Sequence, residues 1–270
     1  DDLPAPDPDE PISWVPGTDL ITGEEVSLPA GMVHFPSPDS RFAPAITTGL
    51  GLGNDGAEAV LSGLYEIIER DATMLAWYST FEPLALDVAE ETFATLSRRA
   101  GSEGLSVTPV LVTQDVDVPV VSVAVHRDAW PRFAVGSAAD LDPNEAAVDA
   151  LSEAIQNWME LRGMGKEGAA DADGAIGSYA DLPPAAESFL DTQGTVPAED
   201  VGPPEPPSGR DELEAVIDRV DSAGLDAYAA PITPRDVSSI GFEAVRVLSP
   251  RAQPLFVSES FFGERARTVP

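Results

Sequence analysis

The chain has 270 residues, 43% of them apolar, which is enough for a sizeable core in one large domain or two small ones. It contains 47 Asp and Glu against 15 Lys and Arg, and the resulting net charge of −32 argues against nucleic-acid binding through a basic surface. Cysteine is absent, so thiol nucleophiles, Cys-ligated zinc and disulfides are excluded.

Acidic residues occur in every segment and Lys166 is the only lysine, a pattern typical of a surface adapted to concentrated salt. Molar salt screens charges beyond about 3 Å, so we expect a halophilic protein whose fold weakens as salt is removed. The apolar content and helical periodicity argue against disorder. No apolar run reaches membrane-spanning length and no signal peptide is visible, so we expect a cytoplasmic protein without membrane contact.

The chain starts at Asp1 with a Pro/Asp-rich lead, residues 1–11, and is expected to be a segment of a longer protein. ISWVPGTDL and EEVSLPA flank Thr22-Gly23 and predict a β-hairpin. The proline-containing stretch Gly31 to Thr48 is predicted to be a loop. The following GLGNDG fits G-x-G-x-x-G, but ITTGL before it is a poor buried strand, so we do not expect a dinucleotide-binding fold.

A helix is predicted from about Asn54 to Tyr78. At roughly 100° per residue its apolar residues share one side: Val60, Leu61, Leu64, Ile67, Ile68 and Leu75. The opposite side collects the polar ones: Glu58, Ser62, Glu66, Glu69 and Thr73. Three carboxylates on one stripe repel one another unless water, an arginine or a cation lies between them, so this stripe is the candidate site.

Simpler interpretations of the stripe remain open. Asp55 and Glu58 form a D-x-x-E capping box, which by itself accounts for Glu58. Glu66 and Arg70 are four residues apart and match an ordinary helical ion pair. In so acidic a chain a glutamate stripe is also typical of a solvated face.

After this helix, Asp87 to Ala100 is predicted to be a helix that Gly101 ends. SVTPVLVT and PVVSVAV are predicted strands, and Phe133 to Ala138 is a third. Lys166 to Gly209 is a Gly/Ala/Pro-rich excursion. Asp211 to Ala223 is a predicted helix, and Leu225 to Ala230 and FEAVRVL are predicted strands. Interleaved helices and strands indicate an α/β or α+β class, and no internal repeat is visible.

A second long helix begins at Asp142-Pro143-Asn144-Glu145, with an N-cap, a proline at N1 and an acid at N3, and runs to about Arg162. Its core side is predicted to contain Ala147, Leu151, Ile155 and Trp158. Its other face carries Asp149, Glu153, Gln156 and Glu160. If the apolar backs of both helices are buried in one core, their polar fronts can line one cleft, with Glu153 and Gln156 near Glu66 and Glu69.

The sequence lacks the residues that several kinds of active site require. His34 and His126 are the only histidines and no G-x-S-x-G motif occurs, which argues against a hydrolase triad. No GK[ST] loop is present, which argues against a Walker nucleotide site, and no Glu-x-x-His pair is present, which argues against a di-iron site. Oxygen ligands instead suit Mg²⁺, which takes one or two carboxylates together with water and phosphate oxygens. Acidic helices beside a glycine-rich loop and a helix N-terminus would make a Mg-nucleotide site.

The segment TTGLGLGNDGAEAVLSGLYEIIERDA resembles the signature of the YcaO family, a G-N-x-x-x-E segment leading into E-x-x-E-R. ALSEAIQ is similar to the family's later E-x-x-Q helix, and RVLSPRAQPLF to its C-terminal strand-and-proline region. The match spans roughly Trp14 to the end. It implies a YcaO-like α+β fold over residues 12–270, with mixed sheets packed against long helices whose acidic faces line a nucleotide cleft.

The resemblance implies an enzyme that uses ATP and Mg²⁺ to phosphorylate a peptide backbone amide for thioamide or azoline formation. Carried over by motif, the residues that hold Mg²⁺ and phosphates are Glu58, Glu66 and Glu69. The residues that contact the nucleotide or complete its pocket are Asn54, Arg70, Glu153 and Gln156. The implied partners are a peptide or protein substrate, an E1-like or TfuA-like protein, and a second copy in a homodimer.

The chain departs from the family pattern in three ways. Asp149 stands where the family often has an arginine, so a phosphate contact there is lost or supplied elsewhere, for example by Arg162. The N-terminal part that usually lends a lysine and a serine is missing, and the Pro-rich carboxyl tail tied to cyclodehydration is not evident before Pro270. The lack of an evident Pro-rich tail favours thioamide formation or an unassigned activity over azoline formation. Asp149 and the truncation favour a non-catalytic peptide- or partner-docking module, whereas the intact E-x-x-E-R favours the enzyme.

Overall fold

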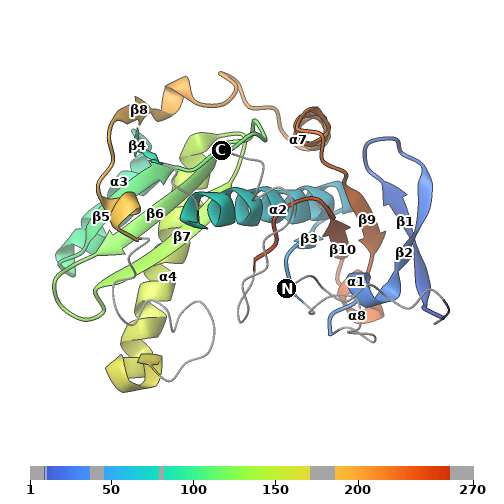
Figure 1. Cartoon of the computed structure of the whole chain (residues 1–270), viewed down its shortest axis with the longest axis horizontal. Helices are drawn as coiled ribbons and strands as arrows, with labels where there is room; N and C mark the ends of the chain where they lie inside the picture. Colours follow the sequence, from blue (N-terminus) through green and yellow to red (C-terminus); the bar gives the residue numbers. More distant parts are fainter. Residues whose placement is uncertain (1–8, 10, 37–45, 79–81, 171–185, 256–270) are drawn as a thin grey trace. The chain divides into compact units, whose positions relative to one another are not determined.

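The computed structural model describes residues 9, 11–36, 46–78, 82–170 and 186–255. Within this part, the chain divides into two compact units, each built around a five-stranded sheet with packed helices (Figure 1). The first unit combines the chain up to Asp71 with Pro207–Leu255, and the second covers Ala72–Pro206. The expectation of a mixed α+β class is confirmed. Most of the lead, part of the predicted loop and of the excursion, and the tail lie outside the described residues.

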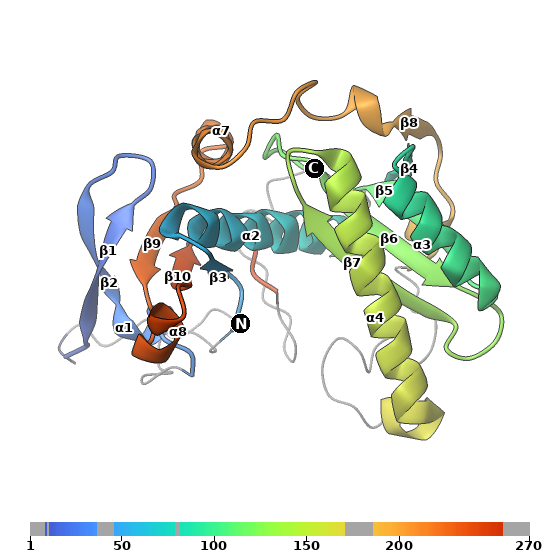
Figure 2. The same cartoon turned by 180° about the vertical axis from the view of Figure 1, so that it is seen from behind.

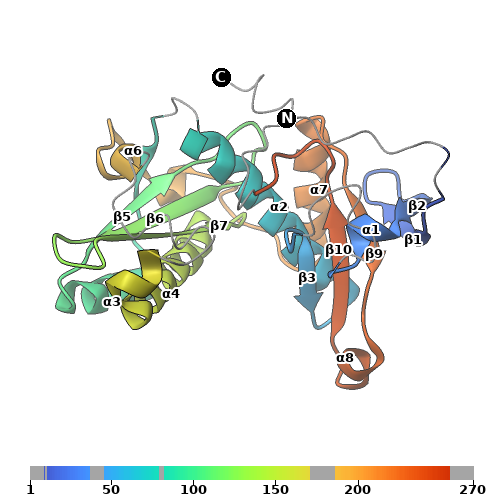
Figure 3. The same ribbon diagram turned by 60° about the horizontal axis from the view of Figure 1, so that its bottom comes forward.

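The sheet of the first unit has the order β2-β1-β9-β10-β3, and all its neighbouring strands are antiparallel. Its strands are β1 (Trp14–Asp19), β2 (Glu25–Pro29), β3 (Leu50–Gly53), β9 (Tyr228–Pro231) and β10 (Glu243–Leu248). The pairing of β1 with β2 confirms the predicted hairpin. Figure 3 shows β10 between β3 and β9, with the short helix α8 (Arg235–Ser239) on the connection between β9 and β10.

Strand β3 corrects the expectation of a glycine-rich loop before the helix, whereas ITTGL contributes only its last residue, Leu50, to the strand. Leu50–Gly53 pairs with β10, and its glycines let it approach helix α2 (Gly56–Tyr78) very closely. A Cβ atom on Gly51 would lie 1.9 Å from the Ala59 carbonyl oxygen. Because β3 lies at the edge of an antiparallel sheet, the GLGNDG run is not part of a parallel dinucleotide-binding unit, as expected.

Apolar side chains bury both faces of this sheet. On one face α2 contributes Leu61, Leu64, Ile67 and Ile68, all buried as predicted. Helix α7 (Arg210–Ser222), which the sequence also predicts, buries Val216 and Val220. Another cluster contains Leu28, Val33 and Ala230. Val33 belongs to the short helix α1 (Ala30–Val33), which overlaps the start of the predicted loop and corrects it there.

The sheet of the second unit has the order β7-β6-β5-β4-β8, antiparallel except for the parallel pair β4 and β8. Its strands are β4 (Leu84–Asp87), β5 (Ser106–Leu111), β6 (Val120–His126), β7 (Phe133–Ala139) and β8 (Thr195–Pro197). Strands β5, β6 and β7 confirm the three predicted ones. Strand β4 was not predicted. Helix α3 (Glu91–Ser102) therefore begins later than predicted, with Glu90 rather than Asp87 as its N-cap, and it continues through Gly101, which was predicted to end it.

Helix α4 (Pro143–Ala170) is the longest element of the second unit, with a kink at Gly165. Asp142 caps it as predicted, because its Oδ1 accepts a hydrogen bond from Asn144 N at 2.9 Å. Figure 2 shows α3 and α4 on the same face of the sheet, where Phe93, Leu151 and Trp158 are buried. Figure 3 shows α6 (Ala186–Leu190) on the opposite face, where Trp77 packs on Phe189 with ring centroids 4.9 Å apart.

The described part of the excursion contains the end of α4, then α6, β8 and the short 3-10 helix η1 (Ala198–Asp200). Among the helices in the described ranges, none has the length and apolar character needed to cross a membrane.

Candidate nucleotide and magnesium site

The start of α2 joins two of the residues predicted to contact nucleotide and metal. Asp55 Oδ1 accepts a hydrogen bond from Glu58 N at 2.9 Å. Glu58 Oε2 accepts in turn from the backbone N and side-chain Nδ2 of Asn54, at 3.0 and 2.9 Å. The capping interpretation is therefore confirmed, and it fixes an exposed carboxylate at the positive end of the helix. Glu58 Oε1 takes no part in these bonds and remains for a ligand.

Glu66 holds the middle of α2 to the residue before β3. Its Oε2 accepts a hydrogen bond from Gly49 N at 2.9 Å. Gly49 has φ of 86°, and a Cβ atom there would lie 2.2 Å from the Val247 carbonyl oxygen, so only glycine fits this turn. The carboxylate of Glu66 is therefore set in one orientation by the backbone.

The polar stripe of α2 becomes progressively buried toward its C-terminal end. Glu58 is exposed and Glu66 half-buried, whereas Glu69 is 8% exposed. Arg70 Nη1 lies 3.4 Å from Glu69 Oε1, so Arg70 forms an ion pair with its neighbour Glu69. The solvated-face interpretation is wrong for Glu69, because a carboxylate so far from water requires compensating partners.

Helix α4 shows the same device in the second unit. Glu153 Oε2 accepts a hydrogen bond from Ser137 N of β7 at 2.8 Å. One turn on, Asn157 Nδ2 donates to the Val135 carbonyl at 2.9 Å. Gly136 lies between them, where a Cβ atom would be 2.3 Å from the Ala150 carbonyl oxygen. Gln156 is exposed on the polar front of the helix.

Asp149 is one turn before Glu153 on the same front. Its side chain is accessible to solvent, yet desolvation by the surrounding protein raises its pKa above the usual aspartate value. The glutamate stripe of α2 belongs to the first unit and the front of α4 to the second. Their predicted convergence on one cleft stays a prediction.

A family model described as "YcaO cyclodehydratase, ATP-ad Mg2+-binding" matches residues 1–253. The chain belongs to the YcaO family. Among solved structures, it is similar to a heterocyclase in complex with substrate and cofactor, with a TM-score of 0.78 and 26% identity over 92% of the chain. It is likewise similar to YcaO from Methanopyrus kandleri bound with AMPPCP and Mg2+, with a TM-score of 0.75 and 28% identity over 92% of the chain. The predicted family and fold are confirmed.

Two sequence relatives are uncharacterized proteins. One, from Methanothermobacter thermautotrophicus, is 27% identical over 95% of this chain and 70% of its own length. The other lies in the tfuA 3′ region of Rhizobium leguminosarum bv. trifolii and is 30% identical over 56% of this chain and 41% of its own length. The chain spans 34% of the heterocyclase and 66% of the Methanopyrus protein. ATP and Mg²⁺, the expected cofactors, are those of the family.

The side chains present in this YcaO-family chain fit a Mg-nucleotide. Glu58, Glu66 and Glu69 offer carboxylate oxygens, the donor type that Mg²⁺ prefers. Within the described ranges, no group of three or more His, Cys, Asp or Glu is arranged to enclose a metal ion. A site of one or two carboxylates completed by water and phosphate oxygens remains compatible with that finding, and such shells are usual for Mg²⁺.

Arg246 is a residue near the stripe that was not predicted from the sequence. It lies on β10, is 6% exposed, and donates from Nη1 to the Ile46 carbonyl at 2.9 Å. Within the described residues its buried Nε has no hydrogen-bond partner. Burial lowers its pKa, and the charge of Glu66 partly restores it. The signal was present in the sequence as one arginine within the otherwise apolar run VRVL.

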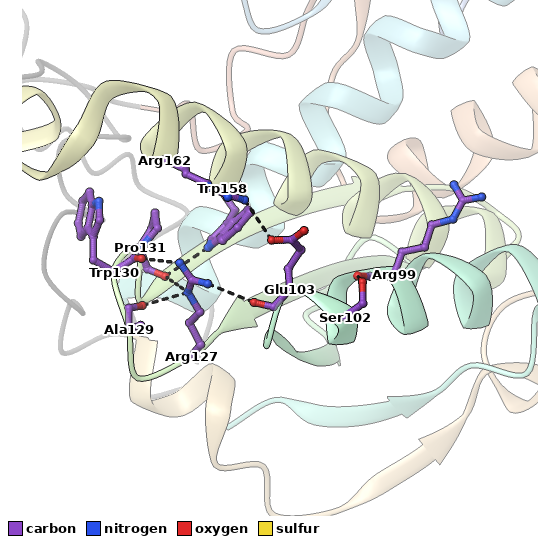
Figure 4. A network of polar contacts seen from close by, with 9 residues as sticks. All are labelled: Arg99, Ser102, Glu103, Arg127, Ala129, Trp130, Pro131, Trp158 and Arg162. Carbon is purple, nitrogen blue, oxygen red and sulfur yellow. Dashed lines mark hydrogen bonds and ion pairs between the residues drawn. The ribbon is translucent and has the colours of Figure 1, made fainter.

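Arg162, considered from sequence as a substitute phosphate contact near Asp149, has another role in the structure. Its Nη1 lies 3.1 Å from Glu103 Oε2, and its guanidinium lies 5.3 Å from the Trp158 ring centroid (Figure 4). Arg127 lies 4.9 Å from the same ring, and donates to the carbonyls of Glu103 and Trp130. This network ties α3, the β6–β7 turn and α4 together.

Within the part of the chain that the structure describes, neither histidine joins a catalytic arrangement. His34 is exposed, and His126 Nε2 lies 3.2 Å from Thr108 Oγ1 on the neighbouring strand. Burial lowers the pKa of His126 below its usual value, which favours the neutral ring. Both are structural or exposed, as expected.

Proposed function

We propose that this chain carries the ATP- and Mg²⁺-binding part of an enzyme that activates a peptide backbone amide. In this proposal the amide oxygen attacks the γ-phosphorus of ATP and ADP leaves, after which a sulfur or hydroxyl nucleophile adds to the amide carbon and phosphate departs. Family membership supports the reaction class. The observation that carries it to these residues is the carboxylate stripe of α2, oriented by backbone N–H groups and buried at one end.

Each residue of the stripe has a proposed task. Glu58, Glu66 and Glu69 would supply the carboxylates for Mg²⁺, one or two to each ion, and the bound ion would neutralise charge on the phosphoryl oxygens. Asn54 and Arg70 would contact the nucleotide, the arginine opposing phosphate charge. Glu153 and Gln156 would complete the pocket. Hydrogen bonds to Gly49 and Asn54 set two of the carboxylates in advance, which reduces the ordering that nucleotide binding requires.

We further propose thioamide formation with a TfuA-like partner as the reaction of the whole protein. The support is the Rhizobium relative, whose gene lies in the tfuA 3′ region. Azoline formation and an E1-like partner are the alternative within the same family. Because the chain spans only part of several relatives, the peptide substrate, partner protein and homodimer belong to this proposal.

Magnesium-dependent nucleotide binding tests the proposal directly. Calorimetry of the chain in molar KCl should show Mg-ATP binding that Glu69→Gln weakens by about tenfold or more, because it removes a charge from the buried end of the stripe. Glu91→Gln, an exposed first-turn glutamate of α3, gives the matched change of charge away from the site and should bind as the parent does. Equal binding by Glu69→Gln and parent would remove Glu69 from the site.

A peptide- or partner-docking module is the second candidate, and Asp149 is the observation that favours it. A carboxylate where the family often has an arginine repels phosphate. Asp149→Arg should therefore tighten Mg-ATP binding by about tenfold. Slow ATP turnover by the parent that rises in this variant supports a weakened enzyme, whereas no turnover in either, with intact peptide binding, supports the docking module.

A further inference from the structure

The outer edge of β3 lies near the carboxylate stripe of α2. It presents a backbone N–H and C=O that have no hydrogen-bond partner within the described residues. Ala244, the cross-strand partner of Leu52, turns its own N–H and C=O toward the neighbouring segment, where they bond with Thr233 Oγ1 and Ile232 N. Leu52 and Ala244 are therefore a non-hydrogen-bonded antiparallel pair, so the Leu52 N–H and C=O point away from the sheet. No hydrogen bond within the described residues uses either group.

The side chain of Leu52 points to the sheet face opposite α2, since Gly51 and Gly53 on either side face that helix. It is 56% exposed. Phe242, the residue before β10, is exposed as well. An edge strand with outward backbone groups and an exposed apolar side chain is the surface to which an extended peptide adds as a further strand.

In the second unit, side chains of helix α4 form hydrogen bonds with the outward backbone groups of the edge strand β7. In β7, Glu153 takes the outward N–H of Ser137 and Asn157 the outward C=O of Val135. On the β3 side, Glu66 takes only the N–H of Gly49, before the strand begins. Leu52 follows three residues later, and within the described residues no side chain of α2 bonds its outward N–H or C=O.

The position of Leu52 relates this edge to the proposed chemistry. Asn54 is two residues further on, a distance of about 7 Å along an extended chain. A peptide paired with Leu52 would run beside Asn54 and the N-terminus of α2, where the helix dipole stabilises negative charge. Pairing through the backbone also suits a reaction at a backbone amide, because it orients the amide without selecting the side chain.

We propose that the outer edge of β3 binds the peptide substrate as an added β-strand, through the N–H and C=O of Leu52. This inference rests on the proposed function, since the occupant is the peptide whose amide is activated. Leu52→Pro removes the outward N–H, and an edge strand tolerates proline where the N–H faces solvent. Leu52→Val keeps the N–H and changes only the side chain, and serves as the matched control.

The probe is a display library of random dodecapeptides, selected against the chain in molar KCl with Mg-AMPPCP. A selected peptide should bind Leu52→Pro about tenfold more weakly than the parent, the loss expected for one backbone hydrogen bond, while Leu52→Val stays within about twofold. N-methylation along the peptide should weaken binding at alternate residues only, because an added strand turns every second N–H to its neighbour. Mg-AMPPCP binding should be the same in all three proteins, which shows that the site is folded.

Equal peptide binding by Leu52→Pro, loss without alternation in the N-methyl series, or selection of no peptide would overturn the inference. So would conversion of a dimer to a monomer by Leu52→Pro with peptide binding retained, because a second copy would then occupy the edge. In these cases Mg-AMPPCP binding by the parent leaves the proposed function standing. Absence of that binding in the parent would instead break the proposed function itself.

Discussion

The two units repeat one local arrangement with different side chains. In each, an edge strand leads into a long helix that packs back on a glycine of that strand: β3 into α2, and β7 into α4. Glu66 and Glu153 are each the eleventh residue of their helix, and each accepts a hydrogen bond from a backbone N–H at its strand. The E-x-x-E-R and E-x-x-Q motifs thus occupy equivalent positions.

The two helices differ at the positions immediately after the shared glutamate. In α2 the next positions are Glu69 and Arg70, an ion pair between a buried carboxylate and a half-buried guanidinium. In α4 they are Gln156 and Asn157, and the amide of Asn157 is spent on the carbonyl of Val135. At these two positions the side chains are therefore charged in α2 and are amides in α4. The Asn157 amide fixes its helix to β7.

The largest expected effect is that of salt on the melting temperature. It distinguishes the contribution of the hydrogen-bonded glutamates from that of the many other acidic residues in both units. With a formal charge of −32, carboxylate repulsion should make the melting temperature rise by about 10 °C or more from roughly 0.2 M to 2 M KCl. The rise should persist in Glu66→Gln, because that carboxylate is bonded to the backbone and is one charge among many. A melting temperature flat in KCl would refute the halophile prediction.

The next test of the equivalence between the two units is the close packing of each edge strand against its helix. Gly51→Ala and Gly136→Ala should each cost about 3 kcal/mol of unfolding free energy, since the new Cβ would meet helix backbone at 1.9 and 2.3 Å. Gly101→Ala, in the last turn of α3 with open space around it, is the control and should stabilise by about 0.5 kcal/mol. Denaturant titration in molar KCl measures all three; a neutral Gly136→Ala would break the proposed equivalence.

Substitutions can separate the structural role of Glu66 and Glu153 from their electrostatic role. Glu66→Ala and Glu153→Ala leave a backbone N–H without its acceptor and should each cost about 1–2 kcal/mol. Glutamine keeps an acceptor oxygen, so both Gln variants should retain most of the stability. Glu66→Gln should nevertheless weaken Mg-ATP binding, because the charge is gone. Unchanged binding in that variant, at full stability, would leave Glu66 a purely structural residue.

The smallest effect concerns Asp149 and its raised pKa. A carboxyl whose folded pKa exceeds its unfolded value loses stability as pH rises from the unfolded value, near 3.8, through the folded one. Asp149→Asn should therefore raise the melting temperature slightly at neutral pH, by about 1–2 °C, and not below pH 3.8. A variant that melts lower at neutral pH would show that the ionised form of Asp149 has a favourable partner.

Much of the secondary structure followed from the sequence by itself. Both long helices, with their apolar backs and polar fronts, follow from a periodicity of about 3.6 residues and from Asp55 and Asp142 at their starts. The YcaO motifs lie on those helices, so the family could also be recognised from the sequence. Strand β3 was missed because its glycines carry no β-propensity, and β4 because Leu84–Asp87 is too short to show alternation.

Tertiary structure alone decided which polar groups are fixed and which are buried. Periodicity placed Glu58, Glu66 and Glu69 on one stripe, but only tertiary packing left the first exposed and the last 8% exposed. The bonds of Glu66 to Gly49 and of Glu153 to Ser137 join residues 16 or 17 apart, beyond the reach of helical spacing. The repeat of strand and helix is likewise invisible as a sequence repeat, because backbone geometry recurs there while the side chains differ.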